Sequence, residues 1–221
     1  MIQENMNIVK KIFAVAALAL GLVSVQTAFA QEAPDVLIKR ISQEVLDAAK
    51  SDKEIQSGNQ KHILDLVEAK VLPHVDFQRM TALAAGRFWR QATPEQQKQL
   101  TDEFRALLVY TYSGAIAQIR DQKLEFKPFR ADPSDTEVEV RSQVLQPRGG
   151  DPIQLNYRLE KTPAGWKIFD MNVLGAWLVE TYKGNFASEI SKGGIDGLIK
   201  TLAERNKRLA TGTAKGVKSA S

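Results

Sequence analysis

The chain has 221 residues, of which 43% are hydrophobic and 25% charged, and its formal net charge is +4. This composition is typical of a globular protein, and so mild a positive charge gives no reason to expect a nucleic-acid partner. The sequence contains no cysteine, which excludes disulfides, cysteine-ligated metals and the lipid anchor of a bacterial lipoprotein.

The first thirty residues have the pattern of a cleavable signal peptide. Lys10 and Lys11 precede an apolar run over residues 12–25, and "AFA" at 28–30 is a small-x-small cleavage site. The alternative is an uncleaved membrane anchor, but the run is shorter than the roughly 20 residues that a spanning helix needs. We expect cleavage before Gln31.

Cleavage predicts a soluble protein of the bacterial periplasm. Translation starts at Met1 or Met6, and removal of the segment leaves 28 basic and 25 acidic side chains, a net charge of +3. The remaining chain of about 190 residues is long enough for one hydrophobic core. We expect a single domain over residues 31–208 and a disordered tail over residues 209–221.

The first part of this domain is predicted to be helical. A helix starts at Pro34, "SDKEIQSGNQ" interrupts it, and a second helix stops at Pro73. Asp76 is the expected N-cap of a short third helix that Gly86 weakens at its end. The inward positions recur at helical spacing; they are Ile38, Ile41, Val45 and Ala49, then Ile63, Val67 and Val71, then Phe77, Met80, Ala84 and Phe88.

The strongest helix start follows at Thr93. Thr93 is the expected N-cap, Pro94 fits the first helical position, and Gln96 completes a capping box. We expect one helix over residues 94–119, the longest of the protein. Its apolar stripe is Leu100, Phe104, Leu107, Leu108, Thr111, Ala115 and Ile119.

The pattern then changes to that of strands. Apolar and polar residues alternate in "TEVEVRSQVL" and "IQLNYRLEK", and "LEFKPF" and "WKIFDMNV" are also strand-like. The segments "QPRGGDP" and "KTPAGW" are typical of hairpin turns. We expect an antiparallel meander of about four strands with one apolar and one polar face.

Helical spacing returns after Leu174 and breaks at "SKGGIDG", before a last helix around Leu198. Helices, then a sheet, then helices that fold back on the sheet predict an α+β protein.

Few residues suggest catalysis. His62 and His74 lie near helix ends without a ligand cluster, so we expect no metal site, and no nucleophile-elbow or phosphate-loop motif occurs. Asp170 stands two residues from Ile168 and, by alternation, on the same strand face. Two interpretations remain: a buried acid of a small cone-shaped enzyme, or, as we favour, a structural carboxylate that accepts backbone N–H groups.

Three stretches resemble the MlaC-type family of periplasmic phospholipid-binding proteins, also known as toluene-tolerance proteins. They are "VLPHVDFQRMTALAAGRFWRQATPEQQKQLTDEFRALLVYTY", "GWKIFDMNVLGAWLVETYKGNF" and "GGIDGLIKTLAERN". The chain departs from the family pattern at Ala84-Ala85 and at Trp177, where the family has bulkier residues and Ser, respectively.

The resemblance implies a function without covalent chemistry. The family carries a glycerophospholipid between an outer-membrane lipoprotein complex and an inner-membrane ABC transporter with a lipid-binding partner domain, and so maintains the lipid asymmetry of the outer membrane. The resemblance implies that phospholipid is the cargo and that the protein has no cofactor. It also implies a cone-like fold of the NTF2/cystatin type around an apolar cavity. Such a carrier makes physical sense, because each methylene exposed to water costs about 0.8 kcal/mol.

We expect the apolar face of the sheet to form one wall of the cavity and the helix over residues 94–119 to form another. Arg87 and Arg90 are expected at the surface, where they meet lipid headgroups or an acidic partner, with Trp89 packed inward. The expected lining residues are Val75, Met80, Leu83, Trp89, Phe104, Leu107, Leu108, Val138, Val140, Leu155, Tyr157, Ile168, Val173, Trp177, Tyr182 and Phe186.

Overall fold

The computed structural model describes residues 31–147 and 149–212. The predicted signal peptide and most of the predicted tail lie outside these residues. The last described helix continues to Ala210, two residues beyond the predicted end of the domain.

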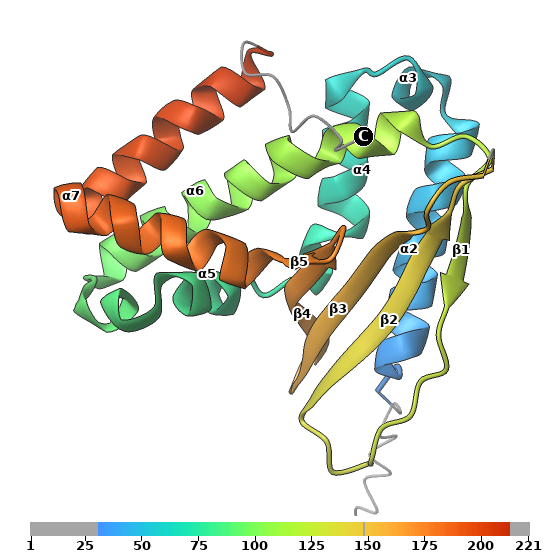
Figure 1. The fold of residues 1–221 in the computed structure, drawn as a ribbon, viewed down its shortest axis with the longest axis horizontal. Coiled ribbons are helices and arrows are strands. Elements are labelled where there is room, and N and C mark those ends of the chain that lie inside the picture. The colour runs from blue at the N-terminus through green and yellow to red at the C-terminus, as the bar shows by residue number, and fades with distance from the viewer. Residues whose placement is uncertain (1–30, 148, 213–221) are drawn as a thin grey trace, which may run out of the picture. The chain divides into compact units, whose positions relative to one another are not determined.

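One antiparallel sheet contains five strands in chain order (Figure 1). The four-stranded meander is thereby confirmed, and a fifth strand of two residues, which the sequence did not indicate, pairs with the end of the fourth. The strands are β1 (Lys123–Phe126), β2 (Glu137–Leu145), β3 (Ile153–Thr162), β4 (Gly165–Val173) and β5 (Ala176–Trp177).

A β-bulge interrupts the alternation of β4. Leu159 pairs with Ile168, but the preceding residue of β3, Arg158, pairs with Asp170, so Phe169 is the extra residue. An inserted residue exchanges the faces of all residues that follow it. Asp170 therefore lies on the polar face with Arg158, opposite to Ile168, and the prediction that they share a face was wrong.

Helix α2 (Pro34–Ser51) covers the apolar face of the sheet (Figure 1). It begins at Pro34 as predicted, because a proline at the first helical position removes only an N–H that has no helical partner. This first apolar cluster, hereafter the sheet cluster, consists of Leu37, Ile38, Ile41, Val140, Tyr157, Leu159, Trp166 and Ile168.

Seven helical elements, from three to 19 residues long, lie between α2 and β1. The predicted caps are present: Asp76 accepts from the Arg79 N–H, and Thr93 and Gln96 form the capping box. The elements are α3 (Lys53–Gln56), α4 (Gln60–Lys70), η1 (Leu72–His74), α5 (Phe77–Ala85), η2 (Gly86–Gln91), α6 (Pro94–Tyr112) and η3 (Ser113–Gln118).

The α-helix predicted for residues 94–119 ends earlier than expected. α6 stops at Tyr112, and the chain continues as the 3-10 helix η3. Gly114, a poor helix former, lies at this transition, and Ala115 is exposed rather than part of the inward stripe. The tighter turn changes which side chains face inward.

The last helix, α7 (Leu178–Ala210), bends at Gly194. Its residues Tyr182 and Phe186 pack with α5 and α6 in a second apolar cluster, hereafter the helical cluster. The helices therefore do not all fold back on the sheet. The buried members are Met80, Ala84, Ala85, Leu100, Phe104, Leu107, Leu108, Leu178, Tyr182, Phe186, Ile190, Leu198 and Leu202.

Candidate functional site

The predicted lining residues divide between the two clusters. In the sequence analysis, the sheet and α6 were expected to face each other across one cavity. Instead, α2 covers the apolar face of the sheet, and α6 packs against α5 and α7. The helical cluster holds Met80, Phe104, Leu107, Leu108, Tyr182 and Phe186, with Trp89 and Val173 packed against it; the sheet cluster holds Val140, Tyr157 and Ile168, with Val138 and Leu155 packed against it.

Three aromatic rings form the centre of the helical cluster. The ring centroid of Phe104 lies 4.9 Å from that of Tyr182 and 5.0 Å from that of Phe186, both in edge-to-face geometry. Burial raises the pKa of the Tyr182 phenol to about 12, and it raises the pKa of Tyr112, which hydrogen-bonds to Tyr182. The apolar surroundings in this cluster disfavour the charged phenolates.

Val75 and Met171 connect the two clusters, because each packs against both. Val75 forms a parallel bridge with Ile168, and the Asp76 N–H donates to the Ile168 carbonyl at 2.8 Å. The start of α5 is thereby attached to β4. Val75 therefore contacts side chains of both clusters.

An arginine that the sequence analysis did not select also joins α5 to the sheet. Arg79 binds Glu160 and donates to Glu137 at 2.5 Å, and its guanidinium stacks on Phe169 at 3.9 Å from the ring centroid. Glu137 and Glu160 are partners in the register of β2 and β3. Only the sheet register brings them together, so no local sequence pattern could have indicated this contact.

Two solvent-open clefts border the clusters. The first, of about 490 Å³, contains Val75 beside charged side chains; its lining is Glu68, Leu72, Pro73, Val75, Asp76, Phe77, Thr101, Asp102, Arg105 and Lys167. The second, of about 410 Å³, lies within the bend of α7; its lining is Leu107, Tyr182, Asn185, Phe186, Ser188, Glu189, Lys192, Leu198, Thr201, Leu202 and Arg205.

Two predicted lining residues lie outside both clusters. Leu83 is 40% exposed on α5, because it lies outside the arc of this helix that is buried at Met80, Ala84 and Ala85. Trp177, in β5, stacks on the guanidinium of Arg158 at 3.8 Å from the ring centroid. Since Arg158 is on the polar face of the sheet, Trp177 lies away from the apolar side chains that it was expected to join.

Asp170 is a structural carboxylate in this arrangement. It is only 2% exposed, and its Oδ1 accepts the N–H groups of Met171 at 2.9 Å and Val179 at 3.0 Å. Its Oδ2 lies 3.5 Å from the Arg158 guanidinium. The carboxylate therefore caps the first turn of α7, where an N–H has no helical partner, as the favoured interpretation predicted.

The motif around Trp89 is divided between interior and surface. Trp89 is half-buried against the helical cluster, whereas Arg87 and Arg90 are exposed. The Arg87 guanidinium lies 4.9 Å from the ring centroid of Phe88. The helix start after η2 is fixed by Gln97, which donates to the Trp89 carbonyl at 3.0 Å.

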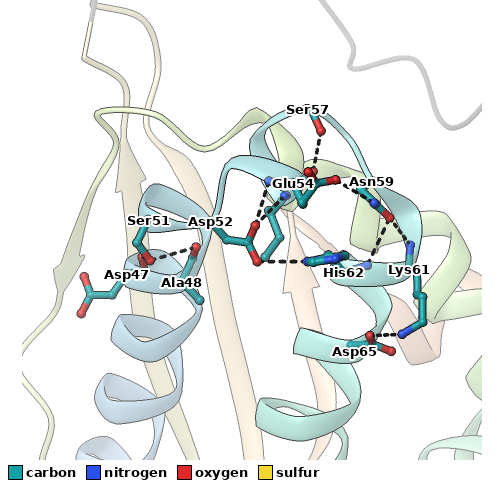
Figure 2. Close-up of polar contacts among 11 residues, drawn as sticks. Asp47, Ala48, Ser51, Asp52, Glu54, Ser57, Asn59, Lys61, His62 and Asp65 are labelled. Carbon is teal, nitrogen blue, oxygen red and sulfur yellow. Dashed lines mark hydrogen bonds and ion pairs between the residues drawn. The ribbon is translucent and has the colours of Figure 1, made fainter.

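The histidines belong to helix ends. His62 Nδ1 lies 3.2 Å from Asp52 Oδ2, while Asp52 Oδ1 accepts the Glu54 N–H at the start of α3 (Figure 2). Burial lowers the pKa of His74, as do the charges of Arg40 and Lys167. Within residues 31–147 and 149–212 there is no group of three or more potential His, Cys, Asp or Glu metal ligands.

None of the described helices is long and apolar enough to cross a membrane. What the described residues form is an α+β protein with one apolar cluster between the sheet and α2 and another among α5, α6 and α7. The model of the MlaC protein family matches residues 39–204, and the chain belongs to this family.

Comparison with individual proteins gives the same assignment. The chain is 22% identical to the intermembrane phospholipid transport system binding protein MlaC of Haemophilus influenzae, over 90% of this chain and 95% of that protein. It is 26% identical to the toluene tolerance protein ttg2D of Pseudomonas putida, over 85% and 89% of the two chains. A phospholipid-binding protein of Ralstonia solanacearum, solved in complex with a phospholipid, is 48% identical with a TM-score of 0.75, covering 80% of this chain and 98% of that one.

Proposed function

We propose that this protein is a periplasmic carrier that holds a glycerophospholipid by its acyl chains. The observation that carries the proposal is its 48% identity, over nearly the whole of the other chain, with a protein solved in complex with a phospholipid. The family match and the transport name of the Haemophilus relative support the same function.

The arrangement of apolar side chains suits such a cargo. Two apolar clusters meet at Val75 and Met171, and acyl chains placed between them exchange water for apolar contacts at about 0.8 kcal/mol per methylene. The headgroup can remain in solvent, so the site needs few polar contacts. The proposed lining is the predicted set without Leu83 and Trp177.

The route of the cargo is part of the proposal. After cleavage before Gln31, the domain diffuses through the periplasm and exchanges lipid with an outer-membrane lipoprotein complex and an inner-membrane ABC transporter with a lipid-binding partner domain. The intermembrane transport name of the relative supports this role. Arg87 and Arg90, both exposed, are the proposed contacts to partners or headgroups.

The observations do not favour an enzyme built on Asp170. Its Oδ1 is occupied by two backbone N–H groups, its Oδ2 faces Arg158, and the side chain is on the polar face of the sheet. A general acid or base needs access to a substrate proton, and neither of the two clefts is lined by Asp170.

The experiment is native mass spectrometry of protein purified from the bacterial periplasm without detergent. We expect a mass that begins at Gln31, carrying one phospholipid that organic extraction releases. A protein of unprocessed mass contradicts the cleavage, and a lipid-free protein contradicts the carrier.

A further inference from the structure

The bend of α7 divides this helix into two arms, residues 178–193 and 195–210. Figure 1 shows them diverging, the first in orange and the second in red. Gly194 has φ 69° and ψ −172°, a region that is essentially restricted to glycine. The bend is therefore encoded in the chain at one residue, and rotation about that residue moves the second arm.

The cleft within this bend leads to the centre of the helical cluster. Among its lining residues are Leu107, Tyr182 and Phe186, which are at most 6% exposed. Leu198 and Leu202 of the second arm line the same cleft. Displacement of the second arm consequently uncovers the aromatic centre described above, whereas the first arm stays attached through Asp170.

Hydrogen bonds hold the second arm on α6 at both of its ends. Gln96 donates to Asp196 at 2.7 Å near the bend, and Asn206 donates to the Glu103 carbonyl at 2.9 Å and to its carboxylate at 2.7 Å. The Asn206 Oδ1 is buried and accepts no hydrogen bond from the residues that the structure describes. An unsatisfied buried acceptor lowers the stability of the docked arm, which favours its release.

The charges at the mouth of the cleft suit an anionic headgroup. Lys192 and Arg205 line it, Lys192 paired with Glu189 at 2.7 Å, and Arg205 in no ion pair with a carboxylate of the described residues. The cleft beside Val75 contains three carboxylates, from Glu68, Asp76 and Asp102, against two cations. A phosphate is therefore better accommodated at the bend.

We infer that the bend of α7 is the entrance of the lipid site: the arm over residues 195–210 swings about Gly194 to admit the acyl chains, and the phosphate rests beside Arg205. The inference rests on the proposed carrier function and assigns the entrance and moving part that this function requires.

The absence of native cysteine makes the inference testable by crosslinking. In the double variant Glu103→Cys, Asn206→Cys, the two thiols are joined with dibromobimane, which fastens the second arm to α6. Exchange of bound phospholipid with fluorescent phospholipid vesicles is then followed. We expect the crosslinked protein to exchange lipid at least about tenfold more slowly, and the uncrosslinked double variant to exchange as fast as the wild type or faster.

The matched control is Lys61→Cys, Asp65→Cys, which replaces an exposed ion pair within α4. Its crosslink introduces the same reagent without restraining the second arm. We therefore expect it to exchange phospholipid at the wild-type rate. Unchanged exchange in the crosslinked Glu103→Cys, Asn206→Cys protein contradicts the entrance while leaving the carrier function intact. Absence of exchangeable phospholipid in the wild type contradicts both.

Discussion

The Asp170 carboxylate accepts the Val179 N–H at 3.0 Å and so ties the last long strand to the first turn of α7. Asp170→Asn retains the acceptor oxygen, and we expect it to keep bound lipid and to cost little stability. Asp170→Ala leaves buried N–H groups without a partner, and we expect it to lose about 1–3 kcal/mol of unfolding free energy. Urea unfolding of the three proteins measures the difference; equal stability of the Ala and Asn variants would contradict the capping role.

The same carboxylate gives a pH dependence with a defined sign. Burial raises the pKa of Asp170 above 3.8, against the hydrogen bonds of Val179 and Met171 and the charge of Arg158. The folded protein thus binds this proton more tightly than the unfolded chain does, and the resulting stabilisation is complete below pH 3.8 and disappears as the pH rises through the folded pKa. The unfolding free energy of the wild type, relative to Asp170→Asn, should fall over this window; a rise over the same window would show the opposite shift.

Val75 and Leu83 provide a matched test of the proposed site. Val75 packs against both clusters, whereas Leu83 is 40% exposed. A carboxylate is costly beside acyl chains, so we expect Val75→Asp to reduce copurified phospholipid strongly and Leu83→Asp to leave it unchanged. Lipid is quantified per folded protein, with circular dichroism as the control for folding. Full lipid occupancy in the folded Val75→Asp variant would show that Val75 does not line the lipid site.

Arg87 and Arg90 should act in docking rather than in lipid retention. Both are exposed, and interactions between surface charges are screened within roughly 8 Å at physiological ionic strength. We expect Arg87→Glu, Arg90→Glu to retain phospholipid but to transfer it more slowly to its partner domain, with a weaker salt dependence than the wild type. Transfer assays over a salt series measure this. If the double variant transfers phospholipid at the wild-type rate at low salt, the two arginines do not take part in docking.

Gly194 and Gly184 lie in the same helix but should respond oppositely to alanine. Gly194 has a backbone conformation that costs other residues about 1–3 kcal/mol, and no atom within 4 Å would obstruct a Cβ. Gly184 is an exposed residue inside the first arm, where alanine is favoured by roughly 0.5–1 kcal/mol. We expect Gly194→Ala to destabilise and Gly184→Ala to stabilise the protein in thermal unfolding. Equal effects would contradict the strained bend.

Sequence periodicity predicted the elements better than their faces. The strand pattern located the meander, and residues 34, 76 and 93 marked helix starts or caps, because these signals are local. The face of Asp170 was mispredicted, since strict alternation does not foresee the bulge at Phe169. The end of α6 was also missed. Ala115 and Ile119 continue the helical spacing of the apolar stripe in the sequence, but the chain around Gly114 forms a 3-10 helix instead.

The site was harder to predict from the sequence than the fold was, for a different reason. Hydrophobicity identifies a buried residue such as Phe104, but it does not show which buried residues share a cluster. That division depends on α2 covering the sheet, a long-range arrangement. Likewise, the contacts of Arg79 with Glu137 and Glu160 join residues 58 and 81 positions apart in the chain, beyond the reach of any motif.

The most direct test of the central claim is to locate the acyl chains in the bound state. The wild-type protein is loaded with a glycerophospholipid that carries a diazirine on one acyl chain, freed of vesicles, irradiated and analysed by peptide mass spectrometry. A carrier that holds lipid by its acyl chains predicts labels on buried residues of the helical and sheet clusters, with Phe104, Tyr182 and Tyr157 among them. Labels restricted to exposed residues such as Leu83 and Leu174, or no label at all, would contradict it.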